Sequence, residues 1–262
     1  MILALDIGNT ETAIGLFDHG DLLDNWRIST HPARTADELG LLFRALLRES
    51  GFDPDAIETA AVASVVPPLT RVFTSAAGYH LGARVHLIDA RTPLPIRLDV
   101  DEPLSVGPDR IANTLAALQL FHTDTIAVDF GTATTFDCIS ATGVFIGGVI
   151  APGISTSAES LVRRTAVLPR VELQPPPTVI GRRTDTAIRS GILFGAVESV
   201  DGIVRRIKAE WRREALVVAT GGLAESIAPH CATIDRVEPF MTLYGLMFAV
   251  HHLEKRGPAR RP

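Results

Sequence analysis

One short motif occurs twice in this chain, each time directly after an apolar run. The first copy occupies residues 6–10 (DIGNT) and the second occupies residues 129–133 (DFGTA). The two copies are separated by about the length of one domain. Because 262 residues suffice for two lobes that each bury a core, the repeat predicts two lobes built on the same plan.

The residues around both copies repeat as well. Apolar and β-branched runs predict strands at 2–6, 12–17, 22–28, 59–66 and 84–88, and then at 125–129, 135–140, 144–150 and 216–219. Apolar residues at helical spacing predict helices over 39–47, 69–76, 155–167, 188–207 and 243–250. Thr35 and Glu38 have the spacing of a capping box before the first helix, and Gly51 stands where that helix should stop. The first half therefore has the order β-β-β-α-β-α-β, and the second half opens in the same way.

An aspartate at a strand end, followed by glycine and hydroxyl-bearing residues, suits the phosphates of a nucleotide. Gly8 and Gly131 permit a backbone path that points amides toward an anion. Side-chain donors stand beside them at Asn9, Thr10, Thr132 and Thr134. Asp6 and Asp129 are placed to hold the cation that neutralises the phosphates. A single loop of this kind is more often an ordinary turn, but two copies at matching places favour nucleotide binding.

Two further glycine motifs follow predicted strands. Gly221 and Gly222 would let the base or ribose of a nucleotide approach the backbone, although the pair alone is also typical of a strand-to-helix turn. The segment 147–153 (GGVIAPG) ends another strand, and either close packing or the approach of a ligand explains its glycines, with packing the simpler interpretation.

The segment 107–110 (GPDR) stands directly before residues of helical character. At a helix start an aspartate is most often a cap or an acidic residue of the first turn, and Asp109 can have that role. Alternatively, Asp109 can be a base that accepts a proton from a substrate hydroxyl. Arg110 is suited to pairing with a substrate or phosphate oxygen. These residues alone leave both interpretations of Asp109 open.

Composition excludes several other classes of protein. The only lysines are Lys208 and Lys255, and neither lies in a glycine-rich segment, which excludes a Walker phosphate loop and a protein-kinase lysine. A net charge of −5 with 21% charged and 46% hydrophobic residues is typical of a folded domain and argues against binding to nucleic acid. Cys138 and Cys231 have neither metal-ligand nor disulfide spacing, and the start of the chain resembles no leader or membrane segment. We therefore expect a cytoplasmic protein that binds no membrane.

Six segments together resemble the type III pantothenate kinases, which belong to the acetate and sugar kinase, heat-shock chaperone and actin superfamily. They are residues 6–10 (DIGNT), 107–110 (GPDR), 129–135 (DFGTATT), 147–153 (GGVIAPG), 184–191 (TDTAIRSG) and 220–224 (TGGLA). The order and distances match over nearly the whole chain, and the set is specific although each segment alone is not. The resemblance implies an α/β fold of two ribonuclease H-like, actin-like ATPase lobes, each a mixed sheet, with the active site in the cleft between them.

The resemblance also implies a division of the chain. The first lobe is expected at residues 1–116 and the second at 117–256, and the last helix can pack back on the first lobe. Residues 257–262 are expected to form a flexible basic tail.

The resembled family uses ATP to phosphorylate pantothenate to 4'-phosphopantothenate, the first step of coenzyme A biosynthesis, with Mg²⁺ or another divalent ion and with K⁺ or NH₄⁺. By resemblance, Asp109 is the general base, Asp6 lies nearest the divalent ion, and Asp129 binds the monovalent cation. The implied ATP contacts are Asp6, Ile7, Gly8, Asn9, Thr10, Glu11, Thr12, Ala13 and Thr132. The implied pantothenate contacts are Val100, Gly107, Pro108, Asp109, Arg110 and Thr184. Family members are homodimers, so Thr184 is expected to act across the subunit interface.

The chain departs from the family pattern at two positions. Val100 stands where many members have a tyrosine that packs on pantothenate, and Pro108 replaces the usual alanine before the aspartate. Pro108 stiffens the loop without removing a needed side chain. Two alternative functions remain open: a related small-molecule kinase of the superfamily, and a nucleotide-binding accessory factor for transcription.

Overall fold

The computed structural model describes residues 1–30, 33–165 and 167–255, and these residues form an α/β fold with two mixed sheets. They divide into two compact units. Unit 1 holds residues 1–120, 143–145 and those from Met241 onward, and unit 2 holds residues 121–142 and 146–240. The lobe boundary at 116 stays a prediction, and the tail predicted at 257–262 lies outside the described residues.

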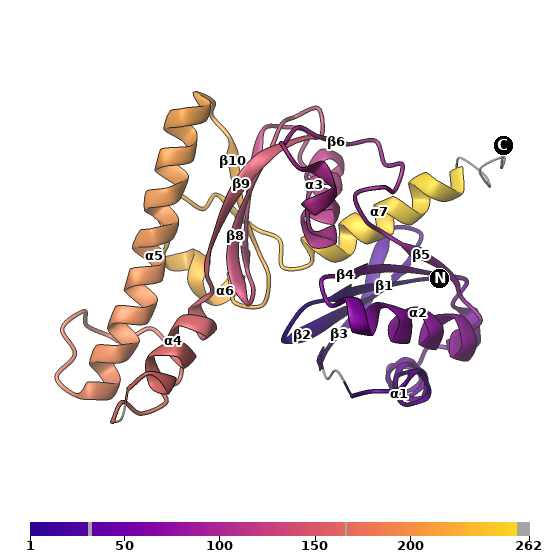
Figure 1. The fold of residues 1–262 in the computed structure, drawn as a ribbon, viewed down its shortest axis with the longest axis horizontal. Coiled ribbons are helices and arrows are strands. Elements are labelled where there is room, and N and C mark those ends of the chain that lie inside the picture. The colour runs from indigo at the N-terminus through magenta and orange to yellow at the C-terminus, as the bar shows by residue number, and fades with distance from the viewer. Residues whose placement is uncertain (31–32, 166, 256–262) are drawn as a thin grey trace. The chain divides into compact units, whose positions relative to one another are not determined.

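Unit 1 has the predicted β-β-β-α-β-α-β order. Its elements are β1 (Ile2–Ile7), β2 (Glu11–Asp18), β3 (Asp21–Ser29), α1 (Ala36–Glu49), β4 (Thr59–Ser64), α2 (Pro67–Leu81) and β5 (Arg84–Leu87), followed by β6 (Arg97–Leu98), α3 (Pro108–Leu120) and the C-terminal helix α7 (Met241–Lys255). The sheet runs β3-β2-β1-β4-β5, with β1 antiparallel to β2 and parallel to β4. Figure 1 shows α1 and α2 on one face of this sheet and α7 on the other.

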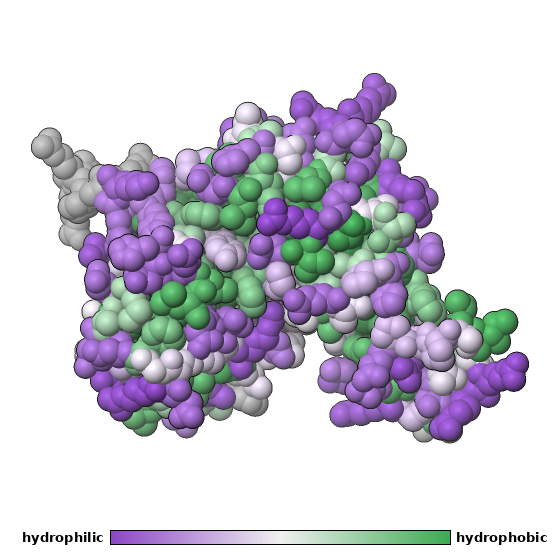
Figure 2. Space-filling view, turned by 180° about the vertical axis from the view of Figure 1, so that it is seen from behind, coloured by the Kyte–Doolittle hydropathy of each residue, from purple (hydrophilic) through white to green (hydrophobic). Residues whose placement is uncertain are grey.

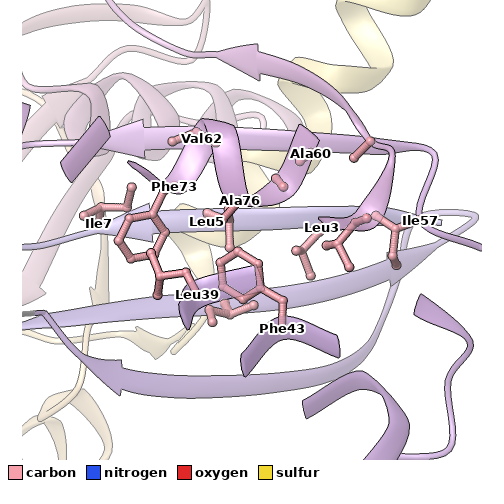
Figure 3. Packing of buried hydrophobic residues seen from close by; sticks show 14 of the residues in the cluster. Leu3, Leu5, Ile7, Leu39, Phe43, Ile57, Ala60, Val62, Phe73 and Ala76 are labelled. Atoms are coloured by element: carbon pink, nitrogen blue, oxygen red, sulfur yellow. The ribbon is translucent and has the colours of Figure 1, made fainter. Parts of the chain in front are cut away.

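The core of unit 1 follows from the alternation of side chains along β1. Leu3, Leu5 and Ile7 point to one face and are almost fully buried against α1 and α2. Figure 3 shows them beside Phe43 and Phe73, whose ring centroids lie 6.1 Å apart. This core holds the end of β1 in a fixed place.

The predicted capping box at the start of α1 is confirmed. The backbone N–H of Glu38 donates to Thr35 Oγ1 over 3.2 Å, and the backbone N–H of Thr35 donates to Glu38 Oε2 over 2.7 Å. Two amides without an intrahelical partner are satisfied in this way.

Unit 2 repeats the plan of unit 1 with an additional helix. Its elements are β7 (Thr125–Phe130), β8 (Ala133–Ile139), β9 (Val144–Pro152), α4 (Ile154–Arg163), α5 (Thr184–Trp211), β10 (Leu216–Thr220), α6 (Ala224–Ile227) and β11 (Arg236–Val237). Their order in the sheet, β11-β10-β7-β8-β9, is the counterpart of β5-β4-β1-β2-β3. The first two residues of β9, Val144 and Phe145, belong to unit 1 and pair with β6.

Two details differ from the sequence prediction. The helix predicted over 155–167 ends at Arg163, where three consecutive polar residues replace the apolar spacing. The strands β6 and β11 were not predicted, because a strand of two residues is too short to show a periodic pattern in the sequence. Such strands are defined by their pairing with a neighbouring strand.

The surface of the molecule carries both hydrophilic and apolar side chains. Figure 2 shows hydrophilic side chains over much of one face of the molecule, with smaller apolar areas between them. Within the described part of the chain, none of the helices combines the length and the hydropathy needed to cross a membrane.

Candidate active site

The first copy of the repeated motif, residues 6–10, which is the first predicted phosphate loop, lies at the carboxyl end of β1. Asp6 is half-buried and stands opposite Ala63 of the parallel strand β4. The N–H of Gly8 donates to the carbonyl of Glu11 over 3.0 Å, and a Cβ on Gly8 would come within 2.7 Å of that oxygen. The tight turn therefore requires glycine and leaves Asp6 at the edge of the sheet where parallel strands end.

The side chains of this loop point in different directions. Ile7 is fully buried in the core, and Thr12 is fully buried with its hydroxyl 3.0 Å from Thr30 Oγ1. Asn9 and Thr10, by contrast, are exposed. A nucleotide at this loop can therefore meet the side chains of Asn9 and Thr10, but only the backbone of Ile7 and Thr12.

Asp109 lies in the first turn of α3, which begins at Pro108. Proline is favoured at the first helical position because its missing N–H would have no intrahelical partner there. The N–H of Arg110 donates to Asp109 Oδ1 over 2.9 Å. A Cβ on Gly107 would overlap that same oxygen, so glycine is needed for the carboxylate to fold back against the chain. The role as a first-turn acid is thus present and is compatible with a role as base.

Val65 connects Asp109 to the edge that carries Asp6. The N–H of Val65 donates to the carbonyl of Ile7 over 3.1 Å, and Val65 Cγ1 would lie 3.9 Å from a Cβ on Gly107. The segment that carries Asp109 therefore lies beside the carboxyl ends of β1 and β4. Crevices at such strand ends are common ligand sites in α/β proteins.

Burial raises the pKa of the Asp109 carboxyl, and the hydrogen bond from the Arg110 N–H only partly opposes this effect. Desolvation disfavours the charged form of a carboxyl group. A carboxylate with a raised pKa is a stronger proton acceptor near neutral pH than an ordinary aspartate. The environment of Asp109 thus suits general base catalysis.

Helix α7 holds α3 at close range. A Cβ on Gly245 would overlap the carbonyl oxygen of Ala112, so the two backbones touch. One residue further along α3, Asn113 accepts a hydrogen bond of 2.9 Å from the hydroxyl of Thr242. Both contacts are buried, so α7 determines where α3 and its first turn lie.

We expect Gly245→Ala to lower the free energy of unfolding by about 1–3 kcal/mol, because the added methyl group forces the two helix backbones apart. Urea unfolding measures this loss. Gly78→Ala is the matched control, since Gly78 lies within α2 and its Cβ would make only ordinary contacts with Val85 and Ala83, and alanine is the better helix former. Equal stability of Gly245→Ala and the wild-type protein would contradict the close contact.

The second predicted phosphate loop, which begins at Asp129, occupies the corresponding place in unit 2. Asp129 stands near the end of β7, opposite Thr220 of the parallel strand β10. Gly221 follows with a φ of +90°, and a Cβ there would overlap Asp129 Oδ1 and lie 2.8 Å from the nitrogen of Phe130. The structure therefore brings the predicted residues Asp129 and Gly221 into direct contact.

The start of α4 supports the loop that holds Thr132. The hydroxyl of Thr156 donates to the carbonyl of Thr132 over 2.6 Å. A Cβ on Gly153 would overlap the carbonyl oxygens of Gly131 and Thr132. Close packing, the simpler of the two interpretations of the segment 147–153, thus explains Gly153.

The carboxylates of Asp6 and Asp129 are suited to cations that also bind phosphate. Among the described residues, no three histidine, cysteine, aspartate or glutamate side chains gather as a metal cage. Mg²⁺ in nucleotide sites commonly takes only one or two carboxylates and completes its shell with phosphates and water. Asp6 is suited to that role, and Asp129 offers one carboxylate in unit 2.

The remaining predicted residues lie near element ends. Val100 is half-buried just after β6, Gly222 is exposed beyond β10, and Thr184 is exposed at the first position of α5. Sequence patterns missed Phe145, whose ring lies under the guanidinium group of Arg110; no local signal marks such a contact.

Comparison with known proteins identifies relatives over most of the chain. A family model for type III pantothenate kinases matches residues 2–206. A type III pantothenate kinase of Moorella thermoacetica is 45% identical over 248 residues, which is 94% of this chain and 97% of that protein.

Solved structures resemble the fold at lower identity. A putative Baf family transcriptional activator from Campylobacter jejuni aligns with a TM-score of 0.59 at 18% identity, covering 97% of this chain and 99% of that one. The ethanolamine utilization protein EutJ from Carboxydothermus hydrogenoformans aligns with a TM-score of 0.53 at 15% identity, over 93% and 88% of the two chains. These likenesses concern the fold alone, and they agree with the predicted α/β fold of two mixed sheets.

Proposed function

This chain belongs to the type III pantothenate kinase family, and from that premise we propose that it transfers the γ-phosphate of ATP to the terminal hydroxyl of pantothenate, with Asp109 as the general base. The product is 4'-phosphopantothenate. The assignment of the base rests on the half-buried Asp109, whose carboxyl has a raised pKa and whose loop lies beside the strand end that carries Asp6.

The residues of the chain have distinct tasks in this proposal. Asp109 accepts the hydroxyl proton as the oxygen attacks phosphorus, and Arg110 pairs with an oxygen of the substrate. The amides and side chains of residues 8–10 and Thr132 donate hydrogen bonds to the phosphates, and Gly221 and Gly222 allow the nucleoside to approach the backbone. Val100, Gly107 and Pro108 line the pantothenate site.

Two cations complete the proposal. Asp6 holds a divalent ion such as Mg²⁺, and Asp129 holds K⁺ or NH₄⁺. When bound, these ions neutralise the negative charge of the phosphates during transfer. We further propose a cytoplasmic homodimer in which Thr184 contacts the pantothenate bound by the partner subunit.

A coupled assay of ADP release tests the function. We expect ADP release to depend on pantothenate and to increase with K⁺ or NH₄⁺. Glucose and N-acetylglucosamine serve as alternative alcohol substrates. Dependence on one of these sugars instead would favour another kinase of the superfamily, and binding of ATP without any acceptor-dependent turnover would favour a regulator.

The pH dependence of kcat/KM tests the base. Because burial raises the pKa of Asp109, activity should be full above this pKa and should be lost as the pH falls through it, at a value above the ordinary aspartate pKa of about 3.9. The measurement is a profile of kcat/KM for pantothenate, with circular dichroism at each pH to show that the protein stays folded. If kcat/KM falls only at or below the ordinary pKa of an aspartate, the raised pKa of Asp109 is contradicted.

A further inference from the structure

Phe145 lies under the side chain of Arg110. It is the second residue of β9 and is 1% exposed. The central carbon of the Arg110 guanidinium group lies 5.0 Å from the centroid of its ring. A guanidinium group at this distance over an aromatic face is attracted by the negative charge density of the ring.

The backbone of Phe145 holds the chain that leads to Val100. Its carbonyl accepts a hydrogen bond of 2.8 Å from the N–H of Asp99, and it stands opposite Leu98 where β6 pairs with β9. One residue thus fixes both ends of the segment 99–110. The backbone of Phe145 holds the start of this segment, and its ring holds the arginine at the end.

We propose that Phe145 is a positioning residue of the pantothenate site, which orders Arg110 and the chain at Val100 before the substrate binds. The inference rests on the proposed function. An arginine side chain has many rotamers, and ordering it on binding weakens affinity. A ring that already holds the guanidinium plane reduces that penalty.

Graded fluorination of the Phe145 ring tests the proposal, because fluorine withdraws charge from the ring face with little change in size. We expect the KM for pantothenate to rise stepwise with each added fluorine, by about 3- to 30-fold in total, which is the range that a cation–π contact supports. The KM for ATP and the melting temperature should stay constant. The same series at Phe136, a buried ring in the core of unit 2, is the control and should leave the KM for pantothenate unchanged.

Phe145→Leu provides a second variant, which keeps an apolar side chain and removes the ring. It should raise the KM for pantothenate at least as far as full fluorination does. If the enzyme turns over pantothenate but its KM for pantothenate does not change with fluorination of Phe145, the proposed role of Phe145 is overturned. Absence of pantothenate turnover in the unmodified enzyme would instead overturn the proposed function, and this inference with it.

Discussion

Asp109→Asn is expected to lower kcat by about 10²- to 10⁴-fold, the range that a general base contributes. Asparagine has the same shape but cannot accept the hydroxyl proton. The affinity for ATP should survive, because the proposed function assigns no contact with the nucleotide to Asp109. Steady-state kinetics with pantothenate and calorimetric titration with a non-hydrolysable ATP analogue measure the two effects.

The same substitution should leave the protein at least as stable as the wild type. A carboxyl whose pKa is raised by burial disfavours folding above that pKa, and the cost disappears as the pH falls and the group takes up a proton. Asparagine carries no charge, so the melting temperature at neutral pH should be equal or higher. Asp21→Asn makes the same chemical change at an exposed carboxyl and should alter neither property. Normal turnover by Asp109→Asn would refute the assignment of the base.

Gly221→Ala is expected to damage both stability and activity. The residue has a φ of +90°, in the region that favours glycine, and a Cβ would overlap the Asp129 carboxylate and lie 3.0 Å from the carbonyl carbon of Phe130. We expect a loss of about 1–3 kcal/mol in the free energy of unfolding. Displacement of the Asp129 carboxylate should also lower kcat/KM by up to about 100-fold and raise the K⁺ concentration needed for activity.

Urea unfolding and a titration of activity with K⁺ measure these effects. Gly202→Ala is the matched control, because it lies within α5 with nothing near its Cβ. It should be neutral or stabilising, since alanine is the better helix former. If Gly221→Ala retains the wild-type response to K⁺, the proposed cation role of Asp129 is wrong.

Much of the fold was predictable because it depends on neighbouring residues. The capping box at Thr35 and Glu38 needs only their spacing, and the strand ends at Asp6 and Asp129 follow from the apolar run and the turn after each. The repeated loop then indicates two similar sheets. These features specify local structure before any tertiary contact forms.

The contacts that shape the candidate site were not predictable in the same way. Gly221 touches Asp129, Gly245 touches Ala112, and Phe145 lies under Arg110. Each pair is distant in sequence, so only the packing of the sheets and helices brings its members together. Sequence patterns predicted that Asp6 and Asp129 each lie near the end of a strand, but not which glycines and rings pack beside the candidate residues.

Identification of the product tests the central claim most directly. The enzyme is incubated with ATP, Mg²⁺, K⁺ and pantothenate, and the products are analysed by mass spectrometry and ³¹P NMR. The account predicts a phosphate monoester on the terminal hydroxyl of pantothenate, formed in equal amount to ADP and absent with Asp109→Asn. Release of ADP and inorganic phosphate with pantothenate left unmodified would contradict it.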